Sequence, residues 1–282
     1  MTRRNLFLFI AAFVAINAAL TRPVQATPIH VFGSGSQYGT VNSDSGAYTP
    51  VGRLTDSFTG DSVKLSGFAF GASNTLLGVT GIDGAGGSGE GNYLWQFDAS
   101  TGVSTDRRDL PVSLVTIARR PGDGQVFGYA NDAGGNGSLY QFDTQNFNPS
   151  FVGTTGVITY GALTFDNANR LYLADSFTGD IYRVNAATAQ ATVFAATGVS
   201  NVSGMAVVGD SLYLFSTDER ARYRVSLDTG ETTFAGNYNI GGAPGDDLIY
   251  GAAIAPTIIP EIASGWLFAG TLLLVKRRRQ AQ

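Results

Sequence analysis

Four short stretches decide the fold: Trp95-Gln96-Phe97-Asp98, Tyr140-Gln141-Phe142-Asp143, Tyr182-Arg183-Val184-Asn185 and Tyr223-Arg224-Val225-Ser226. Each reads as an aromatic, a polar and an apolar residue followed by a residue that favours turns. Alternation of this kind is typical of a half-buried strand that runs into a turn. A weaker copy ends in Val41-Asn42. The sequence therefore contains five copies of one unit of strand and turn.

The turn in each copy has its own signature. Residues 42–46, 98–102 and 226–230 begin with Asn, Asp or Ser and end with Gly four positions later. The first side chain can accept hydrogen bonds from the backbone just downstream, and glycine accepts a positive φ, so this spacing predicts a tight hairpin. Residues 143–147 and 185–189 are degenerate versions of the same turn.

The spacing of the copies predicts their architecture. Successive turns are separated by 56, 45, 42 and 41 residues, and a four-stranded propeller blade needs about 40–45 residues. The long first step is explained by a linker, residues 53–64, and a glycine-rich loop, residues 83–92. We therefore predict an all-β fold, a β-propeller of five four-stranded blades. A six-bladed ring with one eroded copy and an open β-sandwich are the alternatives.

The two ends of the body complement each other. The N-terminal copy lacks a first strand, because residues 29–33 fit the second strand of the repeat. The missing strand is found at the far end, where Tyr250-Gly-Ala-Ala-Ile254 matches Tyr160-Gly-Ala-Leu-Thr164. The termini are therefore expected to share one blade, which closes the ring over a body of residues 27–256 and leaves no free strand edge between its ends.

Aromatic residues recur along the predicted strands. Propellers bury such side chains between blades. We therefore expect inter-blade packing for Tyr93, Trp95, Tyr140, Tyr172, Tyr182, Tyr213 and Tyr223.

The N-terminus predicts export. Arg3-Arg4 precede an apolar run of residues 6–20, and Val24-Gln25-Ala26 supplies small residues at the spacing of a cleavage site. Residues 1–26 are therefore expected to be a signal peptide that is cut after Ala26. The general secretory route and the twin-arginine route remain open alternatives.

The C-terminal tail, residues 257–282, contains a second predicted targeting signal. It combines Pro260 and Glu261, an apolar stretch of residues 262–275, and a basic cluster of Lys276, Arg277, Arg278 and Arg279. The apolar stretch is shorter than the roughly 20 residues of a comfortable membrane span, so it predicts a short and transient transmembrane segment whose basic end stays cytoplasmic.

This tail resembles the PEP-CTERM sorting signal, although Ile262 stands where the family has a second proline. Exosortases process that signal in Gram-negative bacteria that export polysaccharide. The resemblance implies an exported protein of the cell envelope, cell surface or extracellular space. Its partners would be the export machinery, an exosortase-like enzyme and exopolysaccharide. An ordinary tail anchor is the alternative.

Charge and composition exclude several functions. Without its two terminal segments the chain retains 11 of its 18 basic residues and 21 of its 22 acidic ones. The body therefore has a net charge near −10, which argues against nucleic acid as a partner. There is no cysteine, so neither disulfides nor thiolate chemistry are available. The only histidine, His30, cannot build a multi-histidine metal centre, and we expect it in the core or at the rim.

One set of acids is a candidate site. An acidic residue follows the second strand of each complete repeat: Asp83, Asp132, Asp175 and Asp218. Loops at this position of a propeller open on one face, where four carboxylates could hold Ca²⁺ or orient a sugar. The alternative is that Asp is simply favoured in turns. Ca²⁺ is the only cofactor that the sequence predicts.

These observations predict a binding or scaffold protein of an extracellular polysaccharide layer, with no catalytic residues identified. The alternative is a carbohydrate-active hydrolase or lyase on a propeller scaffold. A glycosidase requires two or three carboxylates within about 5–10 Å of one another, whereas a binding platform requires exposed aromatic side chains.

Overall fold

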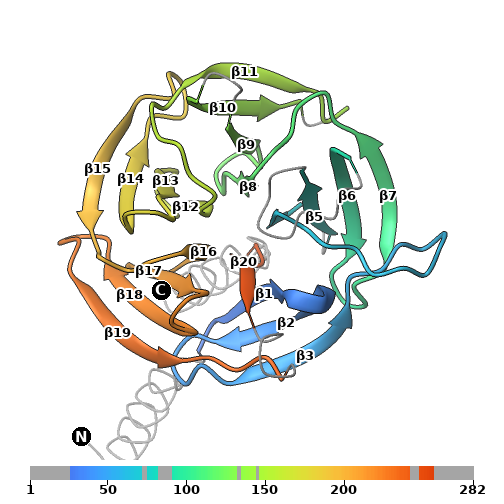
Figure 1. Ribbon diagram of the computed structural model, residues 1–282, viewed down its shortest axis with the longest axis horizontal. Helices are drawn as coiled ribbons and strands as arrows, with labels where there is room; N and C mark the ends of the chain where they lie inside the picture. The colour runs from blue at the N-terminus through green and yellow to red at the C-terminus, as the bar shows by residue number, and fades with distance from the viewer. Residues whose placement is uncertain are drawn as a thin grey trace, which may run out of the picture.

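A computed structural model describes residues 26–71, 75–81, 91–131, 135–143, 146–241 and 248–256. These residues form five four-stranded antiparallel sheets arranged in a ring (Figure 1). The predicted five-bladed β-propeller is therefore confirmed, and the six-bladed and sandwich alternatives are wrong. The described residues contain one short 3-10 turn, Ser34–Ser36, and no α-helix.

The blades follow the chain in order. Blade 1 contains β20 (Ile249–Ala253), β1 (Pro28–Gly33), β2 (Gln37–Asn42) and β3 (Tyr48–Arg53). Blade 2 contains β4 (Gly67–Phe70), β5 (Thr75–Thr80), β6 (Tyr93–Asp98) and β7 (Ser104–Asp109). Blade 3 contains β8 (Thr116–Arg119), β9 (Val126–Asn131), β10 (Gly137–Phe142) and β11 (Pro149–Thr154). Blade 4 contains β12 (Leu163–Phe165), β13 (Leu171–Ala174), β14 (Asp180–Val184) and β15 (Ala191–Ala196). Blade 5 contains β16 (Val202–Val208), β17 (Ser211–Ser216), β18 (Ala221–Ser226) and β19 (Thr232–Asn237).

Blade 1 closes the ring. Its innermost strand is β20, from the C-terminal end of the body, and this strand pairs antiparallel with β1. His30 lies opposite Ala253, and Val31 lies opposite Ala252. The predicted blade shared by both ends of the body is therefore confirmed. The innermost strands also contact one another around the axis, in the order β20, β4, β8, β12 and β16 and back to β20.

The predicted hairpin turns join the third and fourth strands of the blades. In the turn after β6, Asp98 Oδ1 accepts from Ser100 N at 2.7 Å, and Gly102, with φ of 75°, donates its N–H to Asp98 O at 2.8 Å. The degenerate copies keep this backbone without glycine, since Phe147 and Ala189 have φ of 56° and 62°. A register shift interrupts the pairing of all five outer hairpins. Such bulges increase the local twist of the blade.

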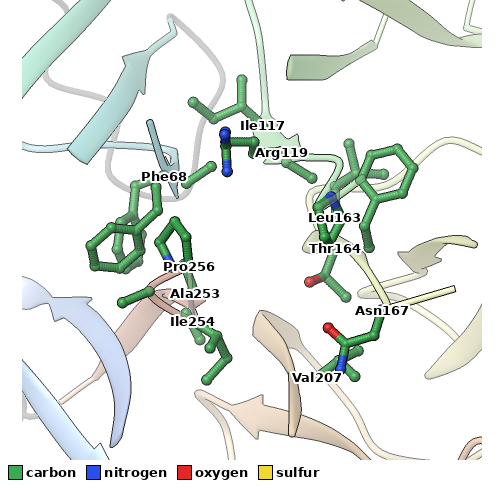
Figure 2. A pocket seen from close by; sticks show the side chains of 17 residues that line it. Phe68, Ile117, Arg119, Leu163, Thr164, Asn167, Val207, Ala253, Ile254 and Pro256 are labelled. Carbon is green, nitrogen blue, oxygen red and sulfur yellow. The ribbon is translucent and has the colours of Figure 1, made fainter. Parts of the chain in front are cut away.

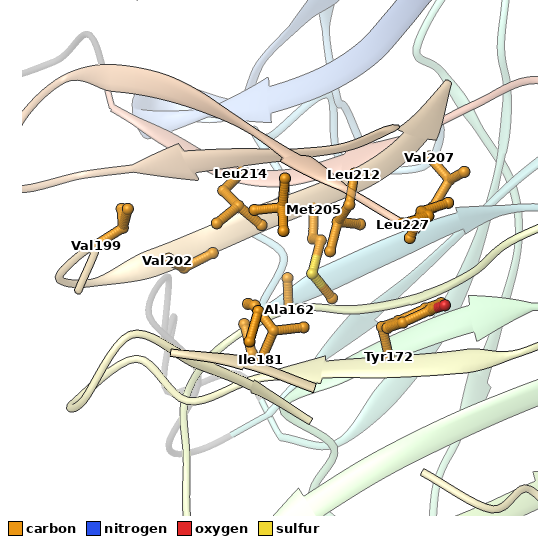
Figure 3. Packing of buried hydrophobic residues seen from close by; sticks show 13 residues of the cluster. Ala162, Tyr172, Ile181, Val199, Val202, Met205, Val207, Leu212, Leu214 and Leu227 are labelled. Carbon is orange, nitrogen blue, oxygen red and sulfur yellow. The ribbon is translucent and has the colours of Figure 1, made fainter. Parts of the chain in front are cut away.

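The core consists of apolar clusters between neighbouring blades. Figure 3 shows the cluster between blades 4 and 5, where Tyr172 and Ile181 face Met205 and Leu214. Four further clusters fill the other junctions. All seven aromatic residues predicted to pack between blades belong to these clusters or pack against them: Tyr93, Trp95, Tyr140, Tyr172, Tyr182, Tyr213 and Tyr223.

Candidate functional site

The ring has two faces of different character. Because the strands of a blade are antiparallel, the loops from first to second strand open on one face and the turns from second to third strand open on the other. We call the first the cavity face and the second the turn face. The turn face carries the predicted acids Asp175 and Asp218, and the cavity face carries the mouth of a central cavity.

The two predicted acids that lie within the described residues have different environments. Asp175 directly follows β13 and is buried, and its carboxylate organises the turn. Its Oδ1 accepts from Phe177 N at 2.9 Å, and its Oδ2 accepts from Thr178 Oγ1 at 2.9 Å. Asp218 is the second residue after β17 and is exposed. Asp175 is therefore a turn residue, whereas the Asp218 carboxylate faces solvent.

The proposed Ca²⁺ site remains a prediction. Asp83 and Asp132 lie outside the described residues. Over the part of the chain that the structure describes, no group of three or more His, Cys, Asp or Glu side chains could hold a metal ion.

Hydrogen bonds join the blade junctions on the turn face. Between blades 3 and 4, Asn131 Nδ2 donates to Thr159 O at 2.9 Å, and Ser176 N donates to Thr159 Oγ1 at 2.8 Å. Between blades 4 and 5, Asn201 N donates to Ser176 O at 3.0 Å, and Thr217 N donates to Asn201 O at 3.2 Å. These bonds form a continuous belt over three blades, and they hold its turns in fixed positions.

The belt extends to the exposed acid. Asn201 Nδ2 donates to Asp218 Oδ1 at 3.0 Å. The backbone N–H of Asn201 donates to blade 4, and its C=O accepts from blade 5. The backbone of Asn201, from which its side chain extends, is therefore held in place. Asp218 is thereby oriented on the same face as the turn that carries Phe177.

An aromatic pair stands on this belt. Tyr160 and Phe177 are 39% and 65% exposed, and their ring centroids lie 6.0 Å apart in an edge-to-face arrangement. Tyr160 N donates to Ser176 Oγ at 3.2 Å, which ties the first ring to the turn of the second. Ile158, 46% exposed, lies in the same linker. Rigid aromatic rings offer large contact area at little cost in conformational entropy.

Neither member of this pair was identified from the sequence, although a signal was present. The hexapeptide Asp-Ser-Phe-Thr-Gly-Asp occurs twice, at residues 56–61 and 175–180. Both copies fold alike, since Phe58 N donates to Asp56 Oδ1 at 2.9 Å as Phe177 N does to Asp175. The Asp and Gly residues form the turn, but the turn does not require a phenylalanine. Phe58 is 89% exposed.

The central cavity opens on the opposite face. It has a volume of about 510 Å³ and is lined by the ends of the five innermost strands (Figure 2). Its walls include Phe68, Ile117, Leu163 and Val207, with Pro256 beyond the end of β20. This volume is typical of a ligand site.

Few of the side chains that line the cavity are polar. Among its described lining residues, the only charged side chain is that of Arg119, which is accompanied by Thr164 and Asn167. Asp166 is next to Asn167 in the chain but is buried, and its carboxylate accepts from Ala168 N at 2.9 Å and Arg170 N at 2.8 Å. The described lining therefore offers no pair of carboxylates of the kind that a glycosidase requires.

His30 lies at the junction of blades 1 and 2, as a core or rim residue. Its Nδ1 lies 2.9 Å from the Tyr38 hydroxyl, which donates to Ala99 O at 3.0 Å. The geometry fits a neutral ring with the proton on Nδ1. The Phe70 ring packs edge-to-face against the His30 ring, with 4.6 Å between the two ring centroids. Burial lowers the pKa of His30 to about 4 and raises the pKa of Tyr38 above its usual range.

The sorting segments lie almost entirely outside the described residues. Of the predicted signal peptide only Ala26 is described, just before β1, and residues 257–282 of the tail are not described. Among the residues with described structure, none forms a helix with the length and apolar character to cross a membrane.

Comparison with known proteins bears on the fold. No family model and no curated protein matches the chain. A chain in the crystal structure of a nidogen/laminin complex is similar in structure, with a TM-score of 0.54 and 12% identity over 81% of this chain and 98% of that chain. A structural genomics protein of unknown function from Bacteroides thetaiotaomicron VPI-5482 is similar with a TM-score of 0.44 and 16% identity, over 74% of this chain and 50% of that chain. The nidogen/laminin likeness supports a propeller fold.

Proposed function

We propose that this protein is an exported binding or scaffold protein of the cell surface or extracellular matrix, and that its turn face contacts exopolysaccharide. The observation that carries the proposal is the exposed pair of Tyr160 and Phe177, with centroids 6.0 Å apart. Sugar rings present apolar C–H faces, which pack on aromatic rings of this kind. The pair is held by the belt rather than by a free loop, so little conformational entropy is lost on binding.

The polar surroundings of the pair suit a sugar. Asn201 and Asp218 lie on the same face and are joined by a hydrogen bond of 3.0 Å. Amide and carboxylate groups supply the donors and acceptors that hydroxyl groups need. If Ca²⁺ binds near Asp132, Asp175 and Asp218, sugar hydroxyl groups could complete its coordination, because Ca²⁺ takes oxygen ligands in a flexible geometry.

The alternative of a carbohydrate-active hydrolase or lyase is less well supported. Its acid and base would be expected at the mouth of the channel, and the described lining of the central cavity contains no carboxylate. Release of new reducing ends from exopolysaccharide by the purified protein would favour this alternative.

The proposed site is tested by binding. Binding to exopolysaccharide of the native host and to a glycan array is measured for the protein and for two double variants. Each measurement is made with Ca²⁺ and with a chelator. Replacement of Tyr160 and Phe177 by Ala should weaken binding at least about tenfold, the loss of roughly 1.4 kcal/mol. Replacement of Phe151 and Phe234, which are 60% and 62% exposed on the outer strands, should leave binding unchanged. Equal binding by all three proteins would refute the site.

Export and sorting rest on the resemblance of the tail to the PEP-CTERM signal. The mature protein is expected to begin at Thr27 after cleavage behind Ala26, and an exosortase-like enzyme is expected to cut near Pro260 and Glu261. Intact-mass measurement of the extracellular fraction tests both sites. A membrane-bound form that retains residues 276–282 would support a plain anchor instead.

A further inference from the structure

We propose that the central cavity binds a small organic acid with an apolar body, whose acid group pairs with Arg119. This ligand site is separate from the turn face, because the cavity opens on the opposite side of the ring. Its failure would leave the proposed polysaccharide site untouched.

The walls of the cavity select an apolar body. Phe68 and Phe70 from blade 2, Ile117 from blade 3 and Leu163 and Phe165 from blade 4 line it. Figure 2 shows the labelled members of this set arranged around a central space. Transfer of an apolar group from water into contact with such side chains is favourable.

The charge of the cavity selects an anion. Arg119 is half-buried at the end of β8, and it takes part in no described hydrogen bond or ion pair. Its neighbour Arg120 shows the contrast, since Arg120 Nη2 is paired with Asp123 Oδ2 at 2.6 Å. The guanidinium of Arg119 lines the cavity beside Gly124. Such a group can bind a carboxylate, a sulfonate or a similar anion in a bidentate manner.

The other classes of ligand fit less well. A divalent cation would meet one positive charge and no described carboxylate in the lining. A neutral hydrocarbon would cover Arg119 without compensating its charge. An inorganic anion would leave the apolar walls unused. An apolar acid satisfies both the walls and the guanidinium.

Two fluorescent probes of similar shape test the proposal on the full chain. The sulfonate 1-anilinonaphthalene-8-sulfonate carries one negative charge, and N-phenyl-1-naphthylamine carries none. Both should bind saturably at one site. Arg119→Gln should lower the affinity for the sulfonate at least about tenfold. It should change the affinity for the neutral probe less than about twofold, because only the hydrogen bond to the charged group is lost.

Two further variants serve as controls. Arg120→Gln removes a neighbouring charge outside the cavity and should alter neither affinity. Thr164→Trp, at a half-buried position of the lining, fills the cavity and should weaken both probes, with a cooperative melt as the check on folding. The proposal is overturned if Arg119→Gln affects both probes equally or neither, or if Arg120→Gln has the same effect. It is also overturned if the full chain binds neither probe.

Discussion

Arg222 is predicted to fasten the last blade to the first. It lies in β18 of blade 5, and its side chain is 2% exposed. Its Nη1 donates to Ser43 O at 2.6 Å and its Nη2 donates to Asp44 O at 3.1 Å, in the turn between β2 and β3 of blade 1. A third contact, Nη1 to Asn42 O, measures 3.4 Å. These bonds join residues about 180 positions apart in the sequence.

The magnitude follows from these contacts. Hydrogen bonds from a charged donor contribute about 1.5–3 kcal/mol each, and two of the three have good geometry. Replacement of Arg222 by Met keeps an unbranched chain of similar length but leaves the buried Ser43 carbonyl without this donor. Removal of the guanidinium also recovers part of its desolvation, since burial lowers the pKa of Arg222 and its Nε has no hydrogen-bond partner. We expect a net loss of about 3 kcal/mol.

Thermal melts of matched variants provide the assay. For a body of this size, about 3 kcal/mol corresponds to a fall in Tm of about 6–12 °C. Arg224→Met on the same strand removes an exposed pair with Asp210 and one hydrogen bond from Nε to Ser211 Oγ, and should lower stability by less, about 1–2 kcal/mol. Arg222→Lys should fall between the two, because an ammonium group cannot reproduce the fork of bonds. Equal melts for Arg222→Met and Arg224→Met would refute the role of Arg222 as a fastening between blades.

Two further predictions concern the core. The pKa of His30 is lowered from 6.5 to about 4, so the unfolded state binds the extra proton first, and stability should fall as the pH drops from about 6.5 to 4, by at most about 3 kcal/mol and less to the extent that solvent reaches the ring. Chemical denaturation against pH checks this, and an equally steep fall in His30→Gln would contradict it. Gly67→Ala in β4 would place a Cβ 2.5 Å from the Thr116 Cα of the next blade, so we expect a loss of about 1–3 kcal/mol. Gly71→Ala, whose Cβ would lie 3.3 Å from its nearest neighbour, should cost less in the same melts, and the reverse order would argue against close packing of the innermost strands.

The fold was largely predictable because its information is local. A strand and a turn repeat every 40-odd residues, and each copy carries the residues that its own hairpin needs, such as Asp98 and Gly102. Closure was predictable for a related reason, since a missing first strand at one end and a surplus strand at the other are both visible in the repeat. The linker at residues 53–64 is the exception, because its position depends on a bridge between Thr55 and Val103 of blade 2, which the linker's own sequence does not reveal.

The candidate sites were less predictable because they depend on distant residues. No sequence motif marks Arg119. It lines a cavity only because five strands from all parts of the chain come together there. The predicted ring of acids assumed that each acid occupies the same position after its second strand. In the register of the blades, Asp175 is equivalent to Ser216, and Asp218 is equivalent to Phe177, two positions further along the turn. The carboxylate at the first position is buried, and the carboxylate at the second is exposed. Phe177 was not predicted as a site residue, because aromatic residues of propellers are generally buried. Its position in a turn nevertheless favours exposure.

Both proposed sites require a closed ring, and the absence of cysteine allows closure to be measured directly. His30 in β1 and Ala253 in β20 are paired residues, so their Cα atoms should lie about 4.5–5.5 Å apart, within reach of a disulfide. Mild oxidation of the double variant with cysteine at both positions should give a complete intramolecular cross-link, seen as a shifted band on non-reducing gels. A control with cysteine at His30 and at Ala196 of blade 4 should give none. No cross-link in the first variant, or equal cross-linking in both, would contradict the closed five-bladed ring.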